Sequence, residues 1–112
     1  METIQTPGLF GNETRTSVLL AIAMLGETQA AEIAKALGRG RSRVKDAVDG
    51  LERAGVLQGT LRGRTRVLSL SPRYVAAQEL KALLDRLALH DLTLQDRLAT
   101  LRRRPRRAGK AL

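Results

Sequence analysis

The sequence contains no cysteine and no tryptophan, and its 112 residues include one histidine, one tyrosine and one phenylalanine. Without cysteine the chain forms neither a disulfide framework nor a thiolate metal site. The single histidine, His90, stands beside Asp91, and no motif pairs it with a serine nucleophile. Aromatic residues make up only 2% of the chain, too few to stack the bases of single-stranded DNA or RNA.

Long apolar runs and clustered carboxylates are absent too. Residues 18–25 are apolar, but this stretch is about half as long as a membrane-spanning helix requires, and the chain does not start like a signal peptide. The acidic residues are scattered among arginines and lysines, so no pair of catalytic carboxylates or set of metal ligands emerges. We therefore expect a cytoplasmic protein that is not an enzyme and has no cofactor, no metal and no membrane contact.

Positive charge is the main compositional feature of the chain. The formal net charge is +9, and 43% of the residues are hydrophobic, which is typical of one small globular domain. Residues 39–66 carry eight basic and three acidic side chains, and residues 102–112 carry six basic ones. Residues 1–38 sum to −2 and residues 67–101 to zero. This distribution indicates an electrostatic footprint for a polyanion, and we expect the protein to be nucleoid-associated.

Two short amphipathic helices joined by a glycine turn are predicted within residues 31–55. The first has its apolar face at Ile33, Ala34 and Leu37 and ends at Gly38. The second has its apolar face at Val44, Ala47, Val48 and Leu51. Polar side chains crowd the first turns of the second helix, which is the part of a recognition helix that meets base edges. These side chains are Arg41, Ser42, Arg43, Lys45, Asp46 and Asp49.

A β-hairpin is predicted next, because residues 56–61 and 65–70 are rich in Val, Leu and Thr and are joined by Arg62-Gly63-Arg64. Arginines at a hairpin tip can enter a narrow minor groove. Arg66 continues the basic run, and no carboxylate occurs between Glu52 and Glu79. DNA contact by this hairpin is our interpretation, and a solubilising edge loop is the alternative.

Several stretches in this order resemble the winged helix-turn-helix transcriptional regulators, especially the ArsR-like and MarR-like groups. They are LFGNETR at 9–15, EIAKALG at 32–38, LERAGVL at 51–57, and RGR at 62–64 followed by VLSLSP at 67–72. The resemblance covers roughly residues 9–87 and implies a mainly α fold with a small β-hairpin wing, an α+β winged helix-turn-helix. The metal-sensing ArsR-like members use Cys and His ligands that this sequence lacks, so metal sensing by that chemistry is not expected.

The segments around the two helices support this reading. Asn12 is a predicted cap for a structural helix that reaches residue 25 and closes at Gly26. Thr28 is a predicted cap of the next helix, whose amino terminus lies near the DNA backbone in the family. One interpretation is that the free amides of that terminus also bind a phosphate, and the alternative is an ordinary cap. Gly50 falls inside the recognition helix. It either allows a close backbone approach, to DNA or to a partner helix, or is a tolerated defect. The predicted DNA contacts are Thr28, Arg39, Arg41, Ser42, Arg43, Lys45, Asp46, Asp49, Arg62, Arg64 and Arg66.

A long C-terminal helix is predicted over residues 73–103, starting after Ser71-Pro72. Its near-heptad apolar positions are Ala77, Leu80, Leu84, Leu87, Leu94, Leu98 and Leu101. A continuous helix of this length would extend about 45 Å and need another helix to pack on, so we expect a homodimer. The alternative is a chain that folds back at residues 91–93, with Thr93 and Asp96 forming a new cap.

The predicted organisation is a flexible arm (1–8), a winged helix-turn-helix domain (9–71), a dimerisation helix (72–103) and a basic tail (104–112). The predicted function is sequence-specific regulation of transcription by a prokaryotic homodimeric repressor on double-stranded DNA. Its recognition helix would lie in the major groove and its wing in the minor groove. Two alternatives remain open, namely an architectural nucleoid protein without sequence choice and a winged-helix module that binds an acidic protein.

Overall fold

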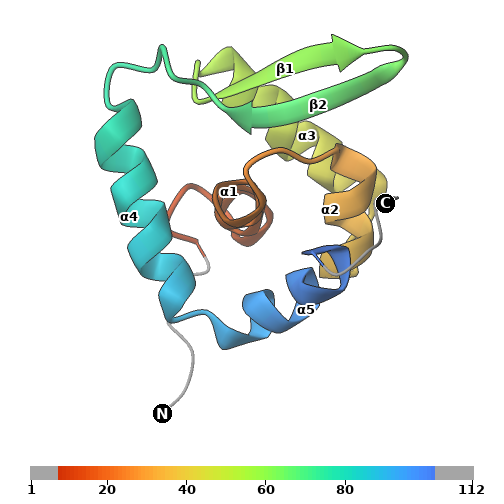
Figure 1. Ribbon diagram of the computed structural model, residues 1–112, viewed down its shortest axis with the longest axis vertical. Helices are drawn as coiled ribbons and strands as arrows, with labels where there is room; N and C mark the ends of the chain where they lie inside the picture. The colour runs from red at the N-terminus through yellow and green to blue at the C-terminus, as the bar shows by residue number, and fades with distance from the viewer. Residues whose placement is uncertain (1–7, 103–112) are drawn as a thin grey trace, which may run out of the picture.

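The computed structural model describes residues 8–102, which form five helices and a two-stranded antiparallel sheet (Figure 1). The elements are α1 (Glu13–Leu25), α2 (Ala30–Leu37), α3 (Arg41–Arg53), β1 (Leu57–Arg62), β2 (Thr65–Leu70), α4 (Ala77–Leu89) and α5 (Leu92–Arg102). The predicted mainly α fold with a small hairpin is confirmed. The predicted basic tail lies outside the described residues, as does the predicted arm apart from Gly8.

Helix α1 forms the centre of the core. In Figure 1 it is seen nearly end-on, with α4 on one side, α2 and α3 on the other, the hairpin above and α5 below. Its residues 18–23 are all apolar and all buried, because packed elements surround the helix. The Asn12 side chain accepts a hydrogen bond from the Arg15 amide at 2.7 Å, and Gly26 ends the helix with a φ of 83°. Both predicted ends are thus confirmed.

The hairpin is fixed to the segment that precedes α2. Arg62 pairs with Thr65 across the tight turn, where Gly63 has a φ of 65°. Thr28 forms an isolated bridge with Leu68 of β2, with N–O distances of 3.1 Å and 2.7 Å. The predicted Thr28 cap is therefore wrong: Thr28 is extended in this bridge and its hydroxyl donates to Glu32, so Gln29 takes the cap position without a side-chain bond.

The C-terminal part corrects the expectation of one long helix. Residues 72–76 form turns, so α4 begins at Ala77 and ends at Leu89. Asp91 then caps α5, its carboxylate accepting a hydrogen bond from the Leu94 amide at 3.0 Å. The fold-back alternative is confirmed, but its cap is Asp91 rather than Thr93 and Asp96. Arg97 holds α5 against α2 by donating to the Leu37 carbonyl at 3.1 Å.

The predicted dimer seam is largely part of the chain's own core. Leu84, Leu87, Leu94 and Leu98 are buried, and Leu80 and Leu101 are partly buried against the same cluster. Ala77 is half-buried and lines an open pocket. The seam prediction is wrong for the four buried leucines, because α4 and α5 each pack their apolar stripe against α1.

Removal of the Asp91 cap tests the break between α4 and α5. We expect Asp91→Ala to lower the free energy of unfolding by about 1 kcal/mol, the usual cost of losing a side-chain cap. Asp96→Ala is the matched control, since Asp96 is an exposed carboxylate of the same helix and should change stability by less than about 0.5 kcal/mol. Urea unfolding measures both; equal losses in the two variants would contradict the observed cap.

Candidate nucleic-acid interface

Helix α3 presents a polar face to solvent because only one stripe of it is buried. Val44, Ala47, Val48 and Leu51 form that stripe, and α3 packs through it against α1 and α2. Arg41, Ser42, Arg43, Lys45 and Asp46 are all exposed, and Asp49 is half-buried. Gly40 occupies the cap position, and no side-chain hydrogen bond caps the helix there. The structure therefore brings six of the predicted contact residues together on one helix.

Asp49 connects the exposed face of α3 with the wing. Lys45 Nζ lies 2.8 Å from Asp49 Oδ2, and Arg66 Nη1 lies 3.8 Å from Asp49 Oδ1. The hydrogen bond from Lys45 lowers the pKa of Asp49, which burial alone would raise, and the charges of Lys45, Arg66 and Arg53 lower it further. Asp49 is thus an anion at neutral pH and holds two cations in place.

The wing arginines differ in what they contact. Arg66 forms an ion pair with Glu52 as well as Asp49, and Gly59 leaves room for that pair: a Cβ there would lie 2.7 Å from Arg66 Nε. Arg62 binds both carboxylate oxygens of Glu27, at 2.9 Å and 2.8 Å. The sequence between Glu52 and Glu79 is free of carboxylates, yet folding brings acidic partners from outside it. Arg64, at the turn, stays exposed.

The remaining predicted contacts divide in the same way. Arg39 pairs with Glu13 of α1 at 2.9 Å, and only 25% of its side chain is exposed. Thr28 is buried in its bridge to β2. Within residues 8–102, Arg41, Arg43 and Arg64 have no ion-pair partner. These three guanidinium groups are therefore available to an external anion without loss of an internal salt bridge.

Gly50 marks a contact that the sequence indicated only in part. A Cβ at this position would lie 2.7 Å from Arg15 Nη2, so the absence of a side chain lets α1 send an arginine across α3. The contact is made by the end of an arginine side chain rather than by a backbone, so a close backbone approach and a tolerated defect both stay predictions for Gly50. Sequence reasoning missed Arg15 itself; the glycine inside a helix was its one signal.

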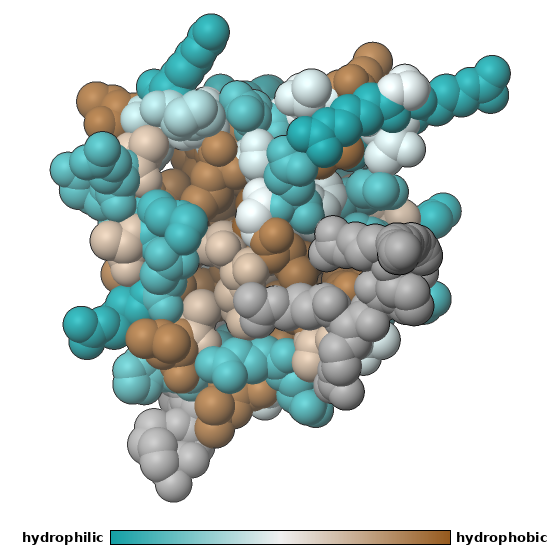
Figure 2. Space-filling model, in the orientation of Figure 1, coloured by the Kyte–Doolittle hydropathy of each residue, from teal (hydrophilic) through white to brown (hydrophobic). Residues whose placement is uncertain are grey.

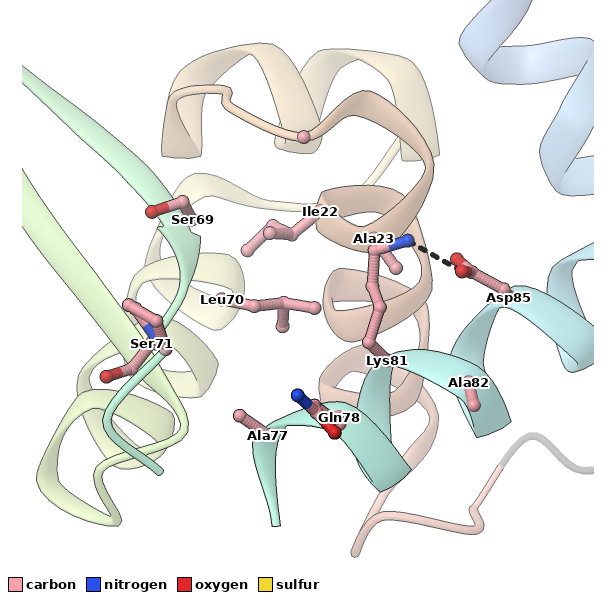
Figure 3. Close-up of a pocket in the computed structure, with 12 residues that line it drawn as sticks. Ile22, Ala23, Ser69, Leu70, Ser71, Ala77, Gln78, Lys81, Ala82 and Asp85 are labelled. Atoms are coloured by element: carbon pink, nitrogen blue, oxygen red, sulfur yellow. Dashed lines mark hydrogen bonds and ion pairs between the residues drawn. The ribbon is translucent and has the colours of Figure 1, made fainter. Parts of the chain in front are cut away.

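An apolar pocket of about 610 Å³ lies away from the polar face of α3, between α1, the end of β2 and α4 (Figures 2 and 3). Figure 3 shows Ile22 and Leu70 pointing into it from α1 and β2. The Lys81–Asp85 ion pair, 2.6 Å long, stands at its rim on α4. Lys81 and Asp85 are the ionisable residues that line the pocket.

Among residues 8–102, no group of three or more His, Cys, Asp or Glu side chains is placed to hold a metal ion. None of the helices described in that range is long and apolar enough to cross a bilayer. The polar face of α3 and the adjoining wing therefore form the candidate site.

Comparisons with known proteins agree with this arrangement. A family model described as "Sugar-specific transcriptional regulator TrmB" matches residues 8–78. The crystal structure of the adhesin competence repressor AdcR from Streptococcus pyogenes is similar with a TM-score of 0.55 and 20% sequence identity. The match covers 81% of this chain and 66% of that chain, and at this identity it shows the fold, a winged helix. No curated protein matches the chain.

Proposed function

The chain belongs to the TrmB family of transcriptional regulators, and from this we propose that it reads specific double-stranded DNA sites as a homodimeric repressor. Membership of the family makes the protein a DNA-binding regulator and not an enzyme. The likeness to AdcR, which is named a repressor, favours repression as the direction of control. Occupying a promoter and so blocking polymerase is the simplest mechanism for such a protein.

The observation that carries this proposal is the exposed face of α3. The 13 residues of this helix extend about 20 Å, and a major groove about 12 Å wide admits one α-helix. Arg41, Ser42 and Arg43 occupy the first turn, where a recognition helix meets base edges. A bidentate arginine–guanine pair discriminates against other bases by about 1 to 3 kcal/mol. The proposed reading residues are therefore Arg41 and Ser42, with Lys45 and Asp46 beside them, whereas Arg43 lies on the side of α3 that faces α1.

The wing has a narrower role than the sequence predicted. Arg62 and Arg66 are held by carboxylates, which leaves Arg64 at the turn as the guanidinium for a minor groove. We assign Arg62 and Arg66 to fixing the wing beside α3 and Arg64 to DNA contact.

We propose that the protein dimerises through the outer surface of α4 and α5, because the leucines of the seam predicted from the sequence are mostly buried in the chain's own core. Leu83, Leu89 and Leu92 of α4 and α5 are 43%, 68% and 56% exposed, although they are large apolar residues. A contiguous patch of exposed apolar side chains marks an interaction surface, and Leu89 and Leu92 lie together at the junction of α4 and α5. A two-fold axis at this surface would present two α3 helices to half-sites about 34 Å apart on one duplex.

We expect the double variant Leu89→Lys and Leu92→Lys to shift the protein from dimer to monomer, because burying the two ammonium groups at an interface is costly. Sedimentation analysis over a range of protein concentrations measures the shift. Leu61→Lys, a similar change at a 71% exposed leucine of β1, should leave the dimer intact. If both proteins keep the wild-type association constant, dimerisation does not use this surface.

Selection from a randomised duplex pool tests sequence reading directly. We expect the purified protein to enrich an inverted repeat by about a thousandfold or more over bulk competitor DNA at physiological salt. Strong salt-sensitive binding without enrichment would instead make the protein architectural. Failure to bind any duplex at about 50 mM salt would leave the acidic-protein module as the explanation of the basic face.

A further inference from the structure

Arg15 is a half-buried cation of α1 that lies against α3. It reaches from α1 across α3, lying against Gly11 and Gly50, where a Cβ would be 3.5 Å from Nη1 and 2.7 Å from Nη2 respectively. Its Nε is buried and has no hydrogen-bond partner, and its guanidinium group makes no ion pair within residues 8–102. A buried donor on a cation is costly to leave unpaired. The positive charge of Arg15 is therefore not balanced by a carboxylate among the described residues.

Two further arginines lie along the same flank of α3. Arg43 lines a hollow of about 400 Å³ together with Arg15, and Arg53 Nη2 would lie 3.9 Å from a Cβ at Gly50. Arg43 and Arg53 are exposed, and neither forms an ion pair with a described residue. We call Arg15, Arg43 and Arg53 the arginine row. At 1.5 Å per residue, the row extends about 15 Å along α3.

Carboxylates near the arginine row do not neutralise it. Glu13 and Asp46 line the same hollow, but Glu13 pairs with Arg39 at 2.9 Å, and Asp46, one carboxylate beside three arginines, forms no ion pair with a described residue. On the opposite flank of α3, Arg66 faces Glu52 and Asp49, so the wing side is internally compensated. The α1 side of the helix thus carries three arginines without an ion pair, whereas among the described wing arginines Arg64 alone has none.

We infer that the arginine row binds the phosphates of one DNA strand at the edge of the major groove that α3 enters. The inference rests on the proposed function and adds residues to it, namely a positioning contact on the flank away from the wing. Guanidinium groups bind phosphate oxygens through charge-assisted hydrogen bonds. With one phosphate per about 3.4 Å of axis on each strand, a row of this length meets more than one. Such contacts fix the register of the helix and carry no base preference.

Salt-dependent binding of a duplex selected by the wild-type protein tests this inference. Each lost phosphate contact should reduce the slope of log K against log salt by about 0.9. We expect Arg43→Gln with Arg53→Gln to reduce it by about 1.8 and to weaken binding by about tenfold or more at 0.1 M salt. Arg73→Gln with Arg86→Gln removes the same charge from exposed residues outside α3 and should leave the slope nearly unchanged.

The outcomes separate this inference from the proposed function. Sites selected by the Arg43 and Arg53 variant should have the same base preferences as wild-type sites, since phosphate contacts are uniform over sequences. A wild-type slope in that variant, equal losses in the control, or altered base preferences would each overturn the inference while leaving DNA reading by α3 intact. Arg15→Gln, checked for folding by thermal unfolding, should reduce the slope by about 0.9 more. The proposed function is overturned separately, by a wild-type protein that binds no duplex DNA or that enriches no sequence from the pool.

Discussion

Replacing Leu98 with alanine is expected to lower the free energy of unfolding by about 3 kcal/mol, because buried leucine-to-alanine changes remove apolar contacts and leave a cavity. Leu98 is 0% exposed and belongs to the core that α5 shares with α1 and α2. Domains of this size are stable by only about 5 to 15 kcal/mol, so the loss is a large fraction of the total. Equilibrium urea unfolding, with the slope checked for constancy, measures it.

Leu61→Ala is the matched control, since it deletes the same atoms from a side chain that is 71% exposed. Its expected cost is about 0.5 kcal/mol. The loss from Leu98→Ala should be the same at every protein concentration, because the contacts are within one chain. A loss that appears only at low protein concentration would mean that Leu98 packs between two chains, and it would contradict the fold-back of α5.

Introducing glutamate at Ser42 is expected to weaken duplex binding by about 100-fold, or about 2.7 kcal/mol, at moderate salt. Ser42 is exposed in the first turn of α3, so the new carboxylate faces the base edges and phosphates that this turn is proposed to meet. An acidic residue in the first turn is favourable to a helix, so the variant should fold at least as well as the wild type. Fluorescence anisotropy with a selected duplex measures the affinity.

Thr93→Glu is a close control for this change. Thr93 is the second residue of α5, as Ser42 is the second residue of α3, and it too is an exposed hydroxyl side chain. The two variants thus have the same charge and the same helix position on different elements. We expect Thr93→Glu to bind the duplex within about twofold of the wild type, apart from the small effect of net charge. Equal weakening by both would mean that net charge, and not the face of α3, controls binding.

The features that sequence reasoning predicted correctly depend on local rules. Asn12 and Gly26 bound α1, and Gly38 ends α2 in the left-handed conformation, because capping involves residues within a few positions of each other. The hairpin follows from the short strands and the glycine at residue 63. The outward face of α3 follows from the apolar spacing of its buried stripe.

The features that it missed depend on partners far away in the chain. Leu87 and Leu94 are seven residues apart, a spacing that fits one long seam as well as two helices that pack separately on α1. Arg62 meets Glu27 across 35 residues, so no pattern around the wing indicates that this arginine is neutralised. Thr28 is of a residue type that often caps helices, but its pairing with Leu68 of β2 decides its conformation. Tertiary context decides each of these cases.

Titration of the isotopically labelled protein with a selected duplex, followed by backbone amide NMR, tests the central claim that α3 is the face that reads DNA. We predict the largest changes of amide chemical shift at residues 41–46 of α3, with smaller changes at the Gly63–Arg64 turn and near Arg15. Amides of α4, on the other side of α1, should change little. Changes concentrated in α4 or around the apolar pocket, with α3 unaffected, would contradict the account.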